Sequence, residues 1–166
     1  ADSNSVVVYA TTDPTEALLL GGATATMSEG RITQIGPTLE VYRRPHDLIT
    51  ARTFSDPPLN TVGVESAGAK HAPAGAATLG FRSHHLKPGA GDPQALKFAV
   101  AVISTEITGS ESFVHVSFGA ERWVMLAHGI HVYPPGEKLA THVELEHVMA
   151  FDASGRALGP VLHEAA

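Results

Sequence analysis

The sequence predicts an α+β chain, with a mixed region of strands and short helices over residues 1–58 and an all-β barrel over residues 59–166. Apolar residues make up 43% of the 166 residues and charged residues 17%, so the chain can bury a core. Sixteen glycines and eleven prolines are too many for a helical bundle and indicate short strands joined by turns. After Pro58, short apolar runs alternate with Gly, Pro and Asp turns at the spacing of a barrel.

The first region opens with a β-branched and aromatic run, which predicts a strand over Val6–Ala10. A helix over Thr15–Leu20 is expected next, because Asp13 suits its N-cap and the pair Gly21-Gly22 suits its C-terminal end.

A β-hairpin follows, since residues 23–27 and 31–35 alternate apolar and polar around a Ser-Glu-Gly turn. Further helices are expected over Leu39–Arg44 and over Leu48–Phe54, the latter capped by Asp47. This region is too small and one-sided for a complete domain, so we expect the chain to be a piece of a longer protein.

The barrel region predicts short strands between turns. Its long run Leu96–Ile107 is expected to bend or change partners midway. Val64–Gly75, rich in alanine and glycine, is expected to be a mobile loop. The aromatic residues of this region fit core positions. The expected strands are Thr61–Glu65, Ala77–Arg82, Leu96–Ile107, Ser112–Phe118, Glu121–Leu126, Ala140–Glu146 and His147–Phe151.

Composition and charge exclude several classes of protein. The chain has no cysteine, which excludes disulfides and zinc–thiolate sites. Its formal net charge of −6, without a basic cluster, argues against a nucleic-acid or anionic-membrane surface. No apolar run approaches about 18 residues, so no membrane span is expected. Residues 1–10 lack the basic and apolar features of a signal peptide.

The ten histidines raise a metal site as an alternative. Neighbouring residues of an extended segment point to opposite faces, so His84 and His85 should not share a metal, and a strand-face histidine such as His115 should be structural or solvated. No metal site is therefore expected. The clusters considered are His84-His85, His128/His131 and His142/His147.

Motifs in the first region have a familiar order. Residues 8–18 read Val-Tyr-Ala-Thr-Thr-Asp-Pro-Thr-Glu-Ala-Leu, residues 30–36 Gly-Arg-Ile-Thr-Gln-Ile-Gly, residues 39–45 Leu-Glu-Val-Tyr-Arg-Arg-Pro, and residues 57–60 Pro-Pro-Leu-Asn. All four resemble motifs of the ATP-binding subunits of maltose- and glycerol-3-phosphate-type ABC importers. In the order given, the motifs are the switch segment, the Gly-x-Ile-x-Gln-x-Gly strand, the Leu-x-x-Tyr-x-x-Pro helix and the Pro-x-Met-Asn hinge. The resemblance implies that residues 1–58 are the C-terminal remnant of an ABC nucleotide-binding domain.

Three motifs in the second region extend the resemblance. Residues 80–86 read Gly-Phe-Arg-Ser-His-His-Leu, residues 106–111 Glu-Ile-Thr-Gly-Ser-Glu, and residues 151–158 Phe-Asp-Ala-Ser-Gly-Arg-Ala-Leu. They are similar to motifs of the TOBE or MOP-like regulatory barrel, of OB type, that is appended to those subunits. The residues that the resemblance places at a regulatory or subunit interface are Arg82, His85, Glu106 and Glu111.

The sequence departs from the family at the switch. The histidine that contacts the γ-phosphate in the family is Thr12 here, which is shorter and carries no titratable proton. We therefore assign no catalytic residue and expect Thr12 to make at most a weak contact near the γ-phosphate. The phosphate-binding loop, the Leu-Ser-Gly-Gly-Gln signature and the acidic Walker B residue are missing, so this piece alone should not hydrolyse ATP.

The resemblance implies an intact subunit that binds ATP and Mg²⁺, while this piece needs no cofactor. Its implied partners are a second ATPase subunit, transmembrane permease subunits at the cytoplasmic face of the inner membrane, and a regulatory protein, but no nucleic acid. The implied substrate is a small carbohydrate, a polyol such as glycerol, or a glycerol phosphate. Thr12 also suggests the paired ATPases of glycerol importers, where a second subunit would supply the competent histidine.

Two alternatives stay open: a stand-alone small-ligand or oxyanion-binding module like MOP domains, and a structural dimerisation domain. The polar residues considered for an oxyanion are Lys97, Ser104 and Thr105.

Overall fold

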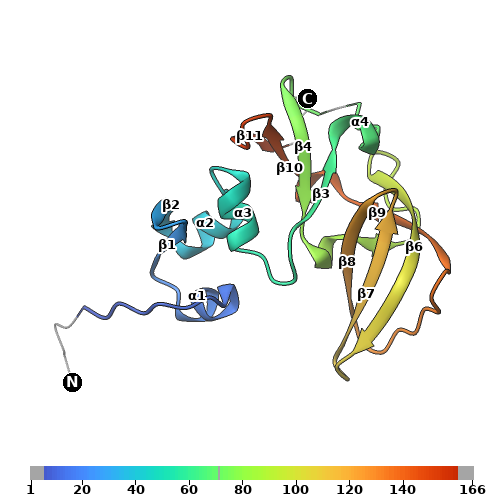
Figure 1. Cartoon of the computed structure of the whole chain (residues 1–166), viewed down its shortest axis with the longest axis horizontal. Coiled ribbons are helices and arrows are strands. Elements are labelled where there is room, and N and C mark those ends of the chain that lie inside the picture. Colours follow the sequence, from blue (N-terminus) through green and yellow to red (C-terminus); the bar gives the residue numbers. More distant parts are fainter. Residues whose placement is uncertain (1–5, 71, 161–166) are drawn as a thin grey trace.

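The computed structural model describes residues 6–70 and 72–160. A small helical region with a two-stranded sheet forms one side of the molecule, and a strand-rich region forms the other (Figure 1). The strand-rich region contains a four-stranded sheet in the order β11-β10-β4-β3 and a curled five-stranded sheet in the order β5-β9-β6-β7-β8. Most of the described elements are therefore strands, with few helices.

The helical region contains helices α1 (Pro14–Leu20), α2 (Thr38–Arg43) and α3 (Leu48–Thr53) and strands β1 (Ala23–Ser28) and β2 (Arg31–Pro37). Asp13 caps α1 and Asp47 caps α3, each accepting a hydrogen bond of 2.7 Å from a backbone amide of its helix. The expected hairpin and helices are confirmed, with ends shifted by one or two residues.

The expected strand at Val6–Ala10 is wrong. The segment is irregular, and Val6, Val7 and Val8 are 92%, 84% and 90% exposed. A strand is stable only when a neighbour satisfies its backbone groups, and within residues 6–70 and 72–160 no strand pairs with this segment. The β-branched residues favour an extended strand, but strand propensity alone does not form one without a neighbouring strand.

The hairpin β1–β2 has an unusual distribution of side chains. Its inner face, packed on α2 and α3, is polar, and its hydroxyls bond to one another: Thr26 Oγ1 lies 2.8 Å from Thr33 Oγ1, and Thr50 Oγ1 of α3 donates to Thr33 Oγ1 at 2.9 Å. The outer face carries Met27, Ile32 and Ile35, all exposed. The apolar face of this sheet is therefore uncovered, although apolar faces normally form the core.

The four-stranded sheet consists of short strands with connecting turns. Its members are β3 (Asn60–Gly63), β4 (Ala76–Phe81), β10 (Met149–Asp152) and β11 (Ala157–Pro160). Helix α4 (Val64–Ala67) follows β3 directly, so part of the expected loop Val64–Gly75 is helical, and the expected strand Thr61–Glu65 ends at Gly63. Gly68, in the left-handed conformation at φ +60°, ends α4 after one turn.

The five-stranded sheet is built around β6 (Leu96–Ile107), whose burial alternates as expected for one face on the core. Residues 96–101 pair with β9 and residues 101–107 with β7, so the expected change of partners along this strand is confirmed. The other strands are β5 (Lys87–Pro88), β7 (Glu111–Phe118), β8 (Glu121–His128) and β9 (Lys138–Val143). Strands β5 and β11 had no sequence signal that we recognised.

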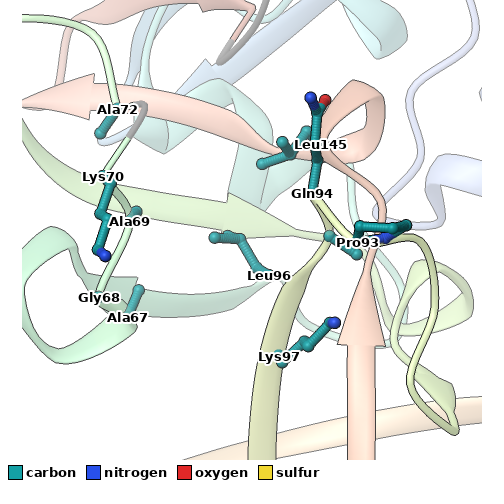
Figure 2. A pocket seen from close by; sticks show the side chains of 11 residues that line it. Ala67, Gly68, Ala69, Lys70, Ala72, Pro93, Gln94, Leu96, Lys97 and Leu145 are labelled. Atoms are coloured by element: carbon teal, nitrogen blue, oxygen red, sulfur yellow. The ribbon is translucent and has the colours of Figure 1, made fainter.

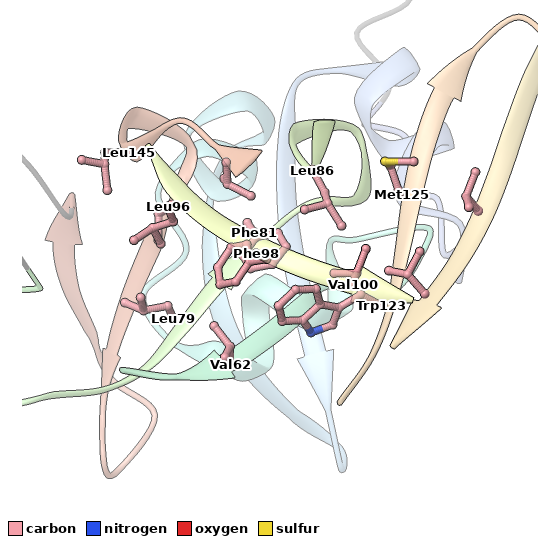
Figure 3. Close-up of a cluster of buried hydrophobic side chains, with 14 of the residues drawn as sticks. Val62, Leu79, Phe81, Leu86, Leu96, Phe98, Val100, Trp123, Met125 and Leu145 are labelled. Atoms are coloured by element: carbon pink, nitrogen blue, oxygen red, sulfur yellow. The ribbon is translucent and has the colours of Figure 1, made fainter. Parts of the chain in front are cut away.

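Aromatic side chains fill the core between the two sheets, as expected (Figure 3). The indole of Trp123 meets the rings of Phe81 and Phe98 edge-on at 5.1 and 4.9 Å and stacks on Phe118 at 4.9 Å. Its Nε1 donates a 2.9 Å hydrogen bond to the Thr61 carbonyl, which satisfies the one polar atom of the ring. This core ties β8, β6 and β4 to the strand that enters from the helical region.

The helical region is also attached through α3. The Leu48 amide donates to the Gly155 carbonyl at 2.8 Å, and the Ala157 amide donates to the His46 carbonyl at 2.9 Å. Below these bonds, a second small core joins Ala51 of α3 to Leu59 and Phe151. The turn between β10 and β11 thus binds the start of α3 through backbone hydrogen bonds.

Candidate functional site

The switch-like segment places Thr12 in an exposed stretch before α1. Its neighbours are tied to Glu16, which accepts hydrogen bonds from the Thr11 hydroxyl and, at 3.3 Å, from the Tyr9 hydroxyl. The amide of Asp13 donates to Thr11 Oγ1 at 2.9 Å. Thr11, Asp13 and Glu16 therefore shape this turn, and the Thr12 side chain is left facing solvent.

Arg82 lies at the contact between the helical and strand-rich regions. Its side chain leaves the end of β4 and reaches α2, where Nη2 donates a 2.6 Å hydrogen bond to the Tyr42 carbonyl. The guanidinium carbon lies 3.7 Å from the centre of the Tyr42 ring, a cation–π contact. Arg82 is buried, and burial lowers the pKa of its guanidinium below the ordinary value.

The Nε atom of Arg82 is buried without a hydrogen-bond partner, and among the residues described here no carboxylate is paired with this side chain. The interface role expected of Arg82 is thus matched by a location between two regions of one chain, while a role between subunits stays a prediction.

His85 belongs to a stack of imidazoles, the histidine cluster His84, His85 and His147. The ring of His85 is parallel to that of His147 at 3.8 Å and edge-on to that of His84 at 4.1 Å. The expectation that His84 and His85 point apart is wrong, because they lie in the 3₁₀ turn η1 (Ser83–His85) and not in a strand. His147 comes from a second 3₁₀ turn, η2 (Leu145–His147).

Burial disfavours the protonated forms of His84 and His85. It lowers the pKa of His85 to about 3, with the neighbouring His84 and His147 adding to the effect, and it also lowers the pKa of His84. The Nδ1 atom of His85 is buried without a partner. His147 Nε2 lies 3.3 Å from Glu146 Oε1, a carboxylate that is itself largely exposed.

Glu106 and Glu111 lie on β6 and β7, and each faces a histidine. Glu106 Oε1 lies 3.2 Å from His115 Nε2, and Glu111 Oε1 lies 3.7 Å from His128 Nδ1. The structure therefore brings Arg82 near His85 but does not gather the four expected interface residues into one site.

Two hollows lie on the strand-rich region. One, of about 410 Å³, has Glu106, His115 and Arg122 among its lining residues. The other, of about 350 Å³, has Leu96 and Leu145 in its lining and carries Lys70 and Lys97. Figure 2 shows Leu96 between the loop that bears Lys70 and the segment that bears Pro93 and Gln94. Sequence reasoning named Lys97 but missed the second lysine, because only the fold brings residues 70 and 97 together.

Neither metal-binding clusters nor membrane-spanning helices are found in the described part of the chain. Within residues 6–70 and 72–160 no group of three or more His, Asp or Glu side chains is arranged to hold a metal ion. No helix there is long and apolar enough to cross a membrane.

Comparison with known proteins identifies relatives along most of the chain. The sn-glycerol-3-phosphate import ATP-binding protein UgpC 2 of Rhizobium johnstonii is 31% identical over 156 residues, which cover 90% of this chain and 45% of the relative. UgpC of Cupriavidus metallidurans is 29% identical over 177 residues, which cover 91% of this chain and 48% of the relative. The uncharacterised ABC transporter ATP-binding protein YcjV of Escherichia coli O157:H7 is 23% identical over 174 residues. No protein-family model matches the chain.

Along about 90% of its length the chain is therefore similar to the ATP-binding subunits of ABC importers, which confirms the resemblance seen in its motifs. Its relatives from Rhizobium and Cupriavidus are sn-glycerol-3-phosphate import ATP-binding proteins. The chain spans about half the length of the curated relatives it matches, at 45% and 48% of the two UgpC proteins above.

Proposed function

We propose that the chain is the C-terminal part of an ATP-binding subunit that energises uptake of glycerol 3-phosphate or a related small polyol or carbohydrate. The observation that carries the proposal is the similarity to proteins of that name along 90% of the chain. The intact subunit would bind ATP with Mg²⁺, pair with a second ATPase subunit, and dock on permease subunits at the cytoplasmic face of the inner membrane.

Residues 1–58 would be the trailing part of the nucleotide-binding domain. The uncovered apolar face of the β1–β2 hairpin, with Met27, Ile32 and Ile35, supports this proposal, because the remainder of an α/β domain would cover it.

Residues 59–166 would be the regulatory barrel of TOBE or OB type. The curled five-stranded sheet, closed against a second sheet by an aromatic core, is consistent with such a barrel. In this proposal the barrel pairs subunits and receives a regulatory protein, with Glu106 and Glu111 on its outer surface as candidate contacts.

The transport proposal is tested by uptake of radiolabelled sn-glycerol 3-phosphate in cells with and without the gene that encodes the full-length subunit. Deletion should abolish uptake, and the full-length gene should restore it. Unchanged uptake of glycerol 3-phosphate, glycerol and small sugars after deletion would refute the proposal. The 166-residue chain alone should bind no ATP in equilibrium dialysis, whereas the full-length subunit should bind it.

The switch proposal is tested separately. With Thr12 in place of the family's histidine, ATP hydrolysis by full-length subunits should be slow, and Thr12→His should raise the turnover rate without changing ATP affinity by more than a few fold. Thr11→His is the matched control, because Thr11 precedes the switch position and bonds to Glu16. Full turnover with Thr12 in every subunit would contradict this proposal.

The second hollow favours one further candidate, the small-anion-binding module considered from sequence. Two lysines and no acidic residue line it, and about 350 Å³ falls within the range of small-ligand sites. Calorimetric titration of the chain with inorganic phosphate and with glycerol 3-phosphate tests it. Saturable binding lost in Lys97→Met would support this function, and no heat of binding would exclude it.

A further inference from the structure

Arg82 makes two contacts from the strand-rich region to α2. Arg82 supplies both the 2.6 Å hydrogen bond to the Tyr42 carbonyl and the cation–π contact with the Tyr42 ring at 3.7 Å. Because Ser83 follows it immediately, the position of Arg82 is set by the 3₁₀ turn η1. Any force that moves η1 therefore acts on the contact with α2.

The histidine cluster places protonable groups directly behind this cation. His84 and His85 are the residues of η1 after Ser83, and the ring of His85 is stacked on His147 of η2 at 3.8 Å. Two parallel imidazoles at that distance pack well when both are neutral and repel each other when both are charged.

The charges around the cluster do not favour its protonation. Arg82 and Lys87 contribute positive charge from either end of the η1 segment, and His128 of β8 faces His84. The nearby carboxylates are Glu146, largely exposed beside His147, and Glu111, which faces His128. An added proton therefore meets mostly cations and other imidazoles.

We propose that the histidine cluster makes the Arg82–Tyr42 contact acid-sensitive, so that protonation of His85 separates η1 from η2 and releases Arg82 from α2. The neutral, stacked cluster holds the contact closed near neutral pH. Acidification favours the open arrangement, in which the imidazole of His85 regains water and its ordinary proton affinity.

Linkage gives the size of the effect. In the open arrangement a histidine has an ordinary pKa near ~6.5, whereas burial holds the pKa of His85 at about 3 in the closed arrangement. Lowering the pH from 7.5 to 5.5 therefore multiplies the ratio of open to closed molecules by about ten for His85 alone.

Amide hydrogen exchange tests the proposal on the 166-residue chain. The Arg44 amide, which donates to the Glu40 carbonyl at 2.8 Å, reports on α2. After correction for intrinsic exchange, its protection should fall about tenfold from pH 7.5 to 5.5. In His85→Phe, which keeps a stacking ring but binds no proton, the fall should be less than twofold.

Other variants separate local opening from unfolding. Arg82→Gln should lower Arg44 protection at both pH values and remove its pH dependence, whereas His46→Gln, at an exposed ring, should behave as the wild type. The Val114 amide in the core strand β7 should keep its protection. The proposal fails if Arg44 protection is independent of pH, if His85→Phe retains the tenfold fall, or if Val114 protection falls equally.

Discussion

Asn60 holds the backbone of Val124 from both sides: its Nδ2 donates to the Val124 carbonyl at 2.8 Å, and the Val124 amide donates to its Oδ1 at 2.9 Å. A side-chain amide here takes the place of a neighbouring strand and satisfies one residue of β8. Asn60 is 3% exposed, so water cannot substitute for these bonds. The segment that links the helical region to the strand-rich region is thus anchored at its first strand residue.

Asn60→Ala should lower the free energy of unfolding by about 2–4 kcal/mol, because it leaves the part-buried amide and carbonyl of Val124 without partners. Chemical denaturation followed by the fluorescence of the single tryptophan, Trp123, would measure this. Asn60→Asp is the informative comparison, since it keeps the acceptor for the Val124 amide but places a carboxylate oxygen opposite the carbonyl. A loss below about 0.5 kcal/mol in Asn60→Ala would contradict the anchoring role.

The capping residues Asp47 and Asp13 should differ in their effect on stability. Asp47→Ala removes the N-cap of α3, whose residues Thr50 and Ala51 are buried. The free energy of unfolding should therefore fall by about 1 kcal/mol. Asp13→Ala removes an equivalent cap from α1, in which no residue is buried, and should change only local helicity. The midpoint of thermal unfolding distinguishes the two variants, and equal shifts would show that α1 is part of the cooperative core.

Asp152 should make the turn between β10 and β11 sensitive to acid. Its Oδ1 accepts bonds from the Ser154 hydroxyl at 2.6 Å, the Ser154 amide at 2.8 Å and the Arg156 amide at 3.0 Å, and these bonds, that of the hydroxyl most, lower the pKa of the carboxyl. A lowered carboxyl pKa stabilises the folded state at pH values above the ordinary pKa of 3.8. This stabilisation is lost as the pH falls through the lowered pKa of the folded state.

Carboxyl carbon shifts of Asp152 in an NMR titration should therefore show a midpoint below that of a free aspartate. Ser154→Ala should raise the midpoint, because it removes the hydroxyl donor. An unchanged midpoint in Ser154→Ala would contradict the assigned cause.

Gly91 and Gly89 offer a matched test of close packing. A Cβ on Gly91 would lie 2.2 Å from Cδ2 of the His142 ring, whereas a Cβ on Gly89 would meet nothing within 4 Å, and both glycines have positive φ. Gly89→Ala should cost about 1–2 kcal/mol in backbone strain. Gly91→Ala should cost about 1–3 kcal/mol more and should move His142 away from Glu144. Equal losses in urea denaturation would show that the loop can shift freely.

Local rules predicted the elements whose signals are local. The caps Asp13 and Asp47 and the turn between the hairpin strands β1 and β2 depend on a few neighbouring residues, and all are confirmed. The change of partners along β6 was also visible, since a twelve-residue run exceeds the usual strand length.

Features that depend on distant residues could not be predicted in the same way. Val6–Ala10 has strand composition, but no partner strand is present among the described residues. The stacking of His85 on His147 joins turns far apart in sequence, and the reach of Arg82 to Tyr42 depends on how two regions meet. The short strand β5 exists only because β9 passes beside it.

Strand β6 limits where this region tolerates a change of chain length. Because its first half pairs with β9 and its second half with β7, deleting one residue near Ala101 would exchange inward and outward side chains along one of the two pairings. Insertions and deletions in this sheet should therefore be confined to connections such as residues 129–137, between β8 and β9. Extra residues there do not change the pairing register of the strands.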